Sequence, residues 1–166
     1  MFARPFIDNL DFARNGKELR GEIAVADMPR LQDMLAAPDG VIHYVVRGLL
    51  GKDGKPMLEL ELDGRCHLRC QRCLEAMDYP VKLKSRLLLA PESELDAFAD
   101  DENELDSIAT DRHFDVLDLV EQEILLNLPF APRHPEGGCK AVDMATQPDK
   151  NPFAVLASLK KGKGGL

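Results

Sequence analysis

A strict alternation of apolar and charged residues over residues 57–70 constrains the fold of this 166-residue chain more than any other feature. Leu58, Leu60 and Leu62 fall on one side of an extended strand, and the acidic residues between them fall on the other. This follows because successive side chains of a strand point to opposite faces. The pattern predicts a sheet with one face packed on a core and the other facing water.

Two further strands flank this segment. Residues 41–50 are apolar and rich in β-branched side chains, and Asp53-Gly54 is a dipeptide typical of a hairpin turn. After a loop predicted at 71–79, residues 81–89 form the third strand. Three consecutive strands with short connections predict an antiparallel meander, because parallel strands need long crossovers.

Helices are expected before and after the meander. The sequence predicts a helix over 5–14 that ends at Asn15-Gly16, a short strand at 21–26, and helices over 28–37, 115–128 and 152–160, capped by Asp27, Asp115 and Asn151. In the helix over 115–128, one apolar face is predicted from Leu117, Val120, Ile124 and Leu128. The predicted fold class is α+β: an antiparallel β-meander covered by helices, with a C-terminal helical and loop extension.

The charge is unevenly spread along the chain. Between Glu92 and Glu123 there are thirteen acidic residues and one base, so this segment carries −12 and the remainder carries +4 of the net −8. Like charges repel one another, so an acidic loop is predicted at about 91–111. We expect one domain over residues 1–140, followed over 141–166 by a linker, a short helix and a basic tip.

Several functional classes are disfavoured. No apolar run approaches the roughly eighteen residues of a membrane helix, and the charged N-terminus lacks the apolar stretch of an export signal, so a cytoplasmic protein is expected. Phosphate-binding loops, dinucleotide motifs and nucleophiles in a catalytic context are missing, so no enzymatic activity is expected. The net charge disfavours indiscriminate coating of nucleic acid but allows a local basic face.

The cysteines suggest a metal site. Cys70 and Cys73 are separated by two residues at the end of a strand, a spacing that lets two thiolates bind one ion. Tetrahedral zinc needs two more ligands, which His134 and Cys139 would supply. Cys66 instead continues the buried face of the strand and is interpreted as a small core residue.

Two other interpretations of the cysteines stay open. A redox dithiol would need a lowered thiol pKa, for which Arg72 is a basic neighbour, but no thioredoxin-like βαβ pattern surrounds the pair. The cysteines would otherwise be inert, reduced thiols, as expected in a cytosolic chain.

A basic face is also predicted. If the second and third strands pair around a loop at 71–79, Arg69 lies near Lys82, His67 near Lys84, and Arg65 near Arg86. Like charges directly opposite destabilise a sheet, so the arrangement suggests an anion site such as one for a phosphate backbone. The candidate RNA-binding residues are Arg65, Arg69, Arg72, Lys82, Lys84 and Arg86. The alternatives are a shifted register that pairs the cations with Glu75 or Asp78, or a merely solvated face.

Three stretches resemble a known family. They are Cys70-Gln71-Arg72-Cys73-Leu74, the run from Asp118 to Pro129 followed by His134 and Cys139, and the tail from Asn151 to Lys160. Together they resemble the bacterial YceD family of large ribosomal RNA subunit accumulation proteins, which has chloroplast relatives. Some relatives carry further cysteine pairs near the C-terminus, where this chain has Cys139 alone.

The resemblance implies a non-enzymatic ribosome biogenesis factor needed for accumulation of 23S (large-subunit) ribosomal RNA, and it implies the same four metal ligands. Precursor rRNA or an assembling ribosomal particle would be the partner. The alternative is a protein-binding adaptor that acts on rRNA indirectly. Its contact residues would be Phe153, Val155, Leu156 and Leu159 of the C-terminal helix.

Overall fold

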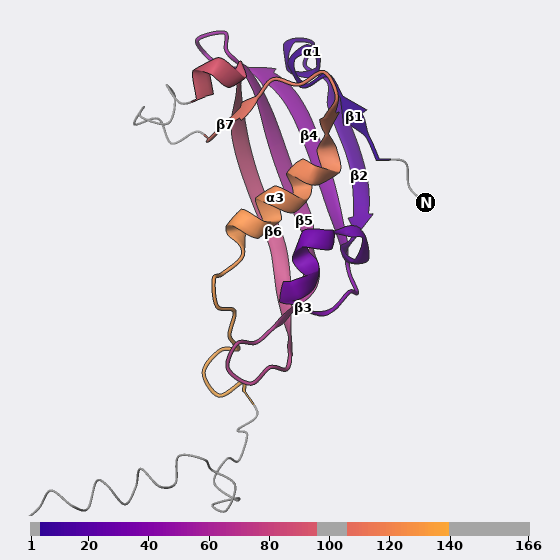
Figure 1. Cartoon of the computed structure of the whole chain (residues 1–166), viewed down its shortest axis with the longest axis vertical. Helices are drawn as coiled ribbons and strands as arrows, with labels where there is room; N and C mark the ends of the chain where they lie inside the picture. The colour runs from indigo at the N-terminus through magenta and orange to yellow at the C-terminus, as the bar shows by residue number, and fades with distance from the viewer. Residues whose placement is uncertain (1–3, 96–105, 140–166) are drawn as a thin grey trace, which may run out of the picture.

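The fold is built on one large sheet, of which three long strands form the centre (Figure 1). The structure is a computed structural model that describes residues 4–95 and 106–139. The strands of this sheet are β2 (Glu18–Ala24), β3 (Leu35–Ala37), β4 (Val41–Leu50), β5 (Pro56–Arg69), β6 (Ala76–Ala90) and β7 (Asp106–Ala109). Their order is β2-β4-β5-β6-β7, with β3 pairing the end of β5 beyond β4.

The predicted α+β class and the antiparallel meander of β4, β5 and β6 are confirmed. Leu58, Leu60 and Leu62 are buried, and the same face continues to Cys66 and Cys70. The predicted turn between β4 and β5 is present: Gly54 adopts a φ of 77°, which favours glycine. The alternation of the sequence therefore correctly predicts which face of β5 packs on the core.

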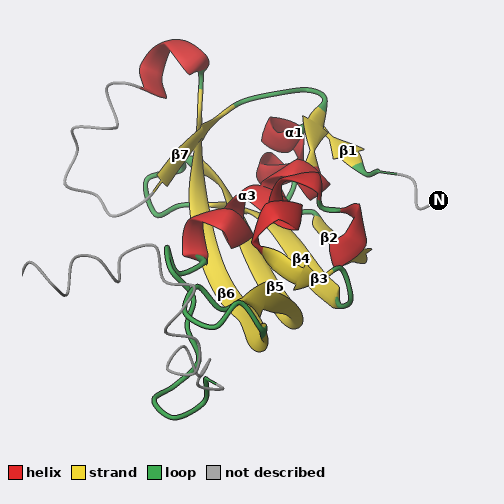
Figure 2. Cartoon of the chain, turned by 60° about the horizontal axis from the view of Figure 1, so that its bottom comes forward, coloured by secondary structure: helices red, strands yellow, loops and turns green. Residues whose placement is uncertain are grey.

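Helices lie on one face of the sheet (Figure 2). Helix α3 (Val116–Asn127) crosses this face, and Asp115 caps it by accepting hydrogen bonds from the backbone N–H groups of Leu117 and Asp118. The predicted apolar face packs on the core, with Val120 and Ile124 buried and Leu117 and Leu128 half-buried against it. The fully buried apolar residues are Val116, Leu119, Val120 and Ile124.

Two buried carboxylates fix the position of α3. Glu121 accepts hydrogen bonds from the backbone N–H of Arg30 at 2.6 Å and from its guanidinium group at 3.2 Å. Glu123 accepts from the hydroxyl of Ser85 on β6 at 2.7 Å. Burying a carboxylate without such donors is costly, so these contacts specify how α3 lies on the sheet. None of the helices in the described ranges is long and apolar enough to cross a membrane.

The N-terminal predictions need correction. The expected helix over 28–37 is instead a short 3-10 helix, η2 (Pro29–Met34), followed by β3, and another 3-10 helix, η1 (Val25–Asp27), precedes it. Leu35 leaves the helical conformation because it pairs with Leu68, on the stretch of β5 that β4 does not reach. Asp27 makes no capping hydrogen bond.

Shorter elements also replace longer predicted ones at the N-terminus. The expected helix over 5–14 is a short strand β1 (Phe6–Ile7) followed by α1 (Asn9–Arg14), and β1 pairs with β8 (Phe114–Asp115). The strand predicted at 21–26 is β2, which begins earlier than predicted, at Glu18, and ends at Ala24.

The predicted acidic loop at 91–111 is also partly wrong. It contains a 3-10 helix η3 (Glu92–Glu94) and strand β7, which pairs parallel to the end of β6. Residues 96–105 lie outside the described part of the chain, as do the linker, C-terminal helix and basic tip predicted over 141–166.

The register of β5 and β6 contradicts the predicted pairing of cations across these two strands. The connection is shorter than expected, since β6 begins at Ala76, and it is closed by a hydrogen bond from the Cys70 N–H to the Glu75 carbonyl. The cations of β6 consequently face acids: the pairs are Lys82 with Asp63, Lys84 with Glu61, and Arg86 with Glu59. The predicted pairs of opposed cations, such as Arg69 with Lys82, do not form.

Opposite charges therefore join the strands on the outer face of the sheet. The carboxylate of Glu59 lies 2.8 Å from Arg86, 3.0 Å from Lys84 and 3.4 Å from Arg47. Glu61 lies 2.7 Å from Lys84 and 2.8 Å from Arg47, and hydrogen bonds from these two cations lower the pKa of its carboxyl to about 2. Glu59 and Glu61 on β5 each contact cations of both β4 and β6, so the pairs form a network across three strands.

We expect Glu59→Ala to destabilise the protein by about 1–3 kcal/mol, because it leaves three cations without their shared, largely buried partner. The control is Asp63→Ala on the same strand, since Asp63 is exposed and makes no ion pair with the described residues. Its expected cost is below about 0.5 kcal/mol. Urea unfolding measures both, and equal losses would contradict the proposed importance of the network.

Candidate metal centre

Two segments far apart in sequence meet at the end of the β5–β6 hairpin (Figure 1). One is the turn over residues 70–75, and the other follows α3 and runs to Cys139. The backbone N–H of Gln71 donates to the carbonyl of Pro132 at 2.8 Å, which holds the two segments together. Residues separated by about sixty positions are thereby brought to one place.

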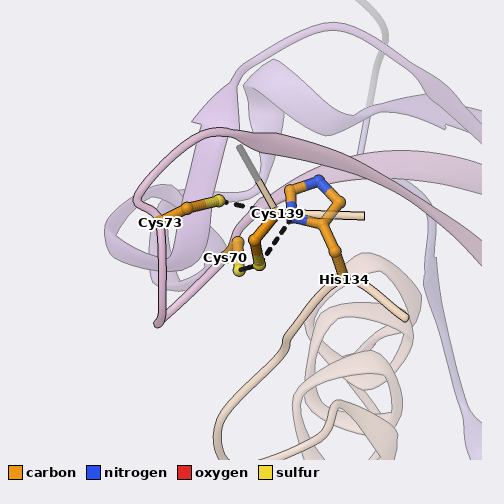
Figure 3. Close-up of side chains that lie close together, drawn as sticks. All are labelled: Cys70, Cys73, His134 and Cys139. Carbon is orange, nitrogen blue, oxygen red and sulfur yellow. Dashed lines mark hydrogen bonds between the residues drawn. The ribbon is translucent and has the colours of Figure 1, made fainter. Parts of the chain in front are cut away.

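The four residues predicted as metal ligands converge there (Figure 3). The Sγ atoms of Cys70 and Cys139 lie 3.7 Å apart. The Nδ1 atom of His134 lies 3.4 Å from the Cys73 sulfur and 3.7 Å from the Cys139 sulfur. All four ligand atoms lie within 4.8 Å of one another, so the cluster could hold a metal ion.

These separations fit a tetrahedral site. Bond lengths of about 2.3 Å to sulfur and 2.0–2.1 Å to nitrogen imply ligand-to-ligand distances of roughly 3.5–3.8 Å in a tetrahedron. Two of the ligand-to-ligand distances, 3.7 and 3.7 Å, fall in this range, and a third, 3.4 Å, lies just below it. One imidazole and three thiol sulfurs form the type of donor set that favours a borderline-soft divalent ion.

The surroundings orient the ligands. The Nε2 atom of His134 lies 3.1 Å from the carbonyl oxygen of Ala76, which accepts a hydrogen bond when Nε2 carries the proton. That tautomer leaves the Nδ1 lone pair facing the sulfurs, as metal-binding histidines require. The guanidinium of Arg72 donates to the Cys139 sulfur at 3.1 Å. Such contacts stabilise a thiolate.

The turn also favours the thiolate form of Cys70. Burial acts to raise the pKa of this thiol, but hydrogen bonds from the backbone N–H groups of Cys73, His134 and Arg72 bring its pKa down to about 5. The turn itself is tight, because Leu74 adopts a left-handed φ of 63° and donates its N–H to the Cys70 carbonyl. The local backbone is therefore arranged to stabilise negative charge on sulfur.

Cys66 is separate from this cluster, as predicted. Its side chain is buried in the core, and burial raises the pKa of its thiol to about 11. It thus behaves as a small apolar side chain.

The predicted RNA-binding residues do not form one continuous basic cluster, and Lys82 lies opposite Asp63. Lys84 and Arg86 pair with Glu59 and Glu61, whereas Arg65, Arg69 and Arg72 lie toward the metal end of the hairpin. The predicted partner-binding residues Phe153, Val155, Leu156 and Leu159 lie outside the described residues. Arg133, at the same end as Arg72, was not predicted, and its position next to His134 was the only signal that could have identified it.

We expect the cluster thiols and Cys66 to be protected from alkylation for different reasons. A bound ion should shield Cys70, Cys73 and Cys139 until a chelator removes it, whereas Cys66 should react only after unfolding, because it is buried. Mass spectrometry of the alkylated protein locates each label. Full labelling of the three cluster thiols without chelator would contradict metal binding.

Comparisons with known proteins point to one family. The model of the family described as "Large ribosomal RNA subunit accumulation protein YceD" matches residues 58–160, which is more than half of the chain. The large ribosomal RNA subunit accumulation protein YceD of Haemophilus influenzae is 32% identical over 122 residues. This alignment covers 65% of the chain and 64% of that relative, so the chain spans less than two thirds of the relative's length. No solved structure matches the chain.

The family match includes the β5–β6 hairpin from Leu58 onward, helix α3 and all four residues of the cluster. The resemblance noted in the sequence is thereby confirmed, and this chain belongs to the YceD family.

Proposed function

We propose that this protein is a non-catalytic, zinc-stabilised factor that promotes the accumulation of large-subunit ribosomal RNA in the cytoplasm. Family membership supports the rRNA role, because the family and the Haemophilus influenzae relative both carry that function in their description. Its partner would be precursor rRNA or an assembling ribosomal particle.

The observation that carries the proposal is the complete set of four protein ligands. Structural zinc sites are closed by four protein side chains, whereas catalytic zinc sites keep one position open for water or substrate. Around a bound ion, Cys70, Cys73, His134 and Cys139 would supply all four protein ligands. The donor set therefore favours a structural ion rather than a catalytic one.

Such an ion would act as a cross-link between distant parts of the chain. It would join the turn after β5 to the segment after α3, which is otherwise held there by few backbone hydrogen bonds, such as that from Gln71 to Pro132. Its binding free energy would contribute to folding, because the ligands converge only in the folded state.

We expect the purified protein to contain one zinc ion per chain and Cys73→Ser to lose both zinc and thermal stability. A loss of about 2–3 kcal/mol would lower Tm by roughly 5–10 °C. Cys66→Ala is the matched control, since it removes a thiol outside the cluster and should retain zinc. Elemental analysis and thermal unfolding measure the two effects. A zinc-free wild-type protein prepared without chelator would contradict the zinc site.

Loss of the protein should lower the ratio of large- to small-subunit rRNA in the cell. In cells lacking the gene, we expect the wild-type protein and Cys66→Ala to restore the ratio and Cys73→Ser to fail, because the zinc cross-link is lost. Gel electrophoresis of total RNA measures the ratio, with immunoblotting to confirm equal protein levels. A normal ratio in the deletion strain would contradict the proposed function.

A further inference from the structure

Apart from Lys82, which lies opposite Asp63 and forms no ion pair with the described residues, the cations on the outer face of the sheet and at the end of the hairpin fall into two groups. Arg47, Lys84 and Arg86 are neutralised by the acidic side chains of β5. Four arginines nearer the metal centre form no ion pair with a carboxylate in the described ranges. These residues, which we call the arginine end, are Arg65, Arg69, Arg72 and Arg133, and all four are exposed.

The acidic residues near the arginine end do not neutralise its four arginines. Asp78 is engaged by His67, with 2.7 Å between the carboxylate and Nδ1. Glu75 and Glu136 lie on the same two segments, but neither forms an ion pair with an arginine within residues 4–95 and 106–139. The guanidinium groups of the arginine end are thus left available to an external anion, although carboxylates are close in sequence.

The fold sets where these arginines lie. Arg65 and Arg69 occupy the outer face of β5, four residues apart and therefore on the same side. Arg72 belongs to the turn, and Arg133 follows Pro132, which is hydrogen-bonded to that turn. From Arg65 to Arg69 the extended strand covers roughly 13 Å, about the rise of four base steps of a nucleic-acid strand, and Arg72 follows in the turn.

The contacts that two of the arginines make leave most of their donors free. Arg69 donates one hydrogen bond to the carbonyl of Leu35 at 3.4 Å, and Arg72 donates one to the Cys139 sulfur. A guanidinium group has five N–H donors, so each contact fixes the side chain without using its capacity for a second ligand. Restrained guanidinium groups suit the two-pronged recognition of phosphate oxygens.

We propose that the arginine end binds the phosphate backbone of large-subunit ribosomal RNA, an inference that rests on the proposed function for the identity of the RNA. Phosphate contacts suit this surface better than base stacking, since the chain has nine aromatic residues and no Trp. The net charge of −8 repels RNA over the rest of the molecule, which confines the contact to this end.

The metal centre would hold half of this surface in place. Arg72 contacts the Cys139 ligand directly, and Arg133 precedes the His134 ligand. Arg65 and Arg69 instead lie on a paired strand, which does not depend on the ion. Removal of the metal should therefore weaken RNA binding without abolishing it.

The test measures the affinity of the full-length, metal-loaded protein for a transcript of large-subunit rRNA by fluorescence anisotropy across a series of KCl concentrations. Arg65→Gln/Arg69→Gln should bind at least about tenfold more weakly at low salt. The slope of log K against log salt should become shallower by roughly 1.4–1.8, because each lost phosphate contact removes about 0.7–0.9. Arg133→Gln, outside the sheet, should reduce the slope by about half as much.

The matched control is Lys52→Gln/Lys55→Gln, which removes two positive charges at the opposite end of the β4–β5–β6 meander. This variant should keep the wild-type slope. Circular dichroism and metal content verify that the variants are folded. Wild-type affinity and slope in Arg65→Gln/Arg69→Gln, equal losses in the control, or failure of the wild-type protein to bind the transcript would overturn the inference.

The two proposals can fail separately. Unchanged RNA binding by Arg65→Gln/Arg69→Gln contradicts only the assignment of the surface. A normal rRNA ratio in cells lacking the protein contradicts the proposed function, even where the arginine end binds RNA in solution.

Discussion

The pairing register of β5 with β6 is the constraint on which the rest of the structure depends. In the middle of the hairpin it places the cations of β6 opposite Glu59, Glu61 and Asp63, so that opposite charges reinforce the backbone hydrogen bonds. At the end of the hairpin it leaves a short turn that contains Cys70 and Cys73. A slip of one residue would move every side chain of β6 to the other face of the sheet. The register therefore specifies the core, the ion network and the position of the cysteine cluster together.

The cluster of Cys70, Cys73, His134 and Cys139 connects the hairpin to a part of the chain that lies outside the sheet. After α3 ends at Asn127 the segment is irregular, and its contacts with the hairpin are few hydrogen bonds and the cluster around His134 and Cys139. A structural ion at this point would fix the irregular segment against the rigid hairpin. A site closed by four protein ligands is typical of structural rather than catalytic ions.

The sequence predicted those features that depend on local patterns. The alternation in β5, the turn at Asp53-Gly54 and the cap at Asp115 are confirmed because each follows from neighbouring residues. The register was predicted wrongly because an even-numbered slip keeps every β6 side chain on the same face, so alternation cannot reveal it. The helix expected at 28–37 failed because strand β3 depends on the free edge of β5. The four cluster residues were predicted as candidate ligands from residue type and spacing. The arginine end could be identified only from the structure, which shows the partners of each cation.

X-ray absorption spectroscopy at the zinc edge of the purified, full-length protein tests the central claim most directly, because it reports the atoms bound to the ion. The account predicts three sulfur ligands at about 2.3 Å and one nitrogen ligand at 2.0–2.1 Å, with no bound water. In the His134→Ala variant, either an oxygen ligand should replace the imidazole nitrogen in the spectrum, or the protein should no longer bind the ion. A wild-type spectrum dominated by oxygen ligands, or one with fewer than three sulfurs, would contradict a closed structural centre formed by Cys70, Cys73, His134 and Cys139.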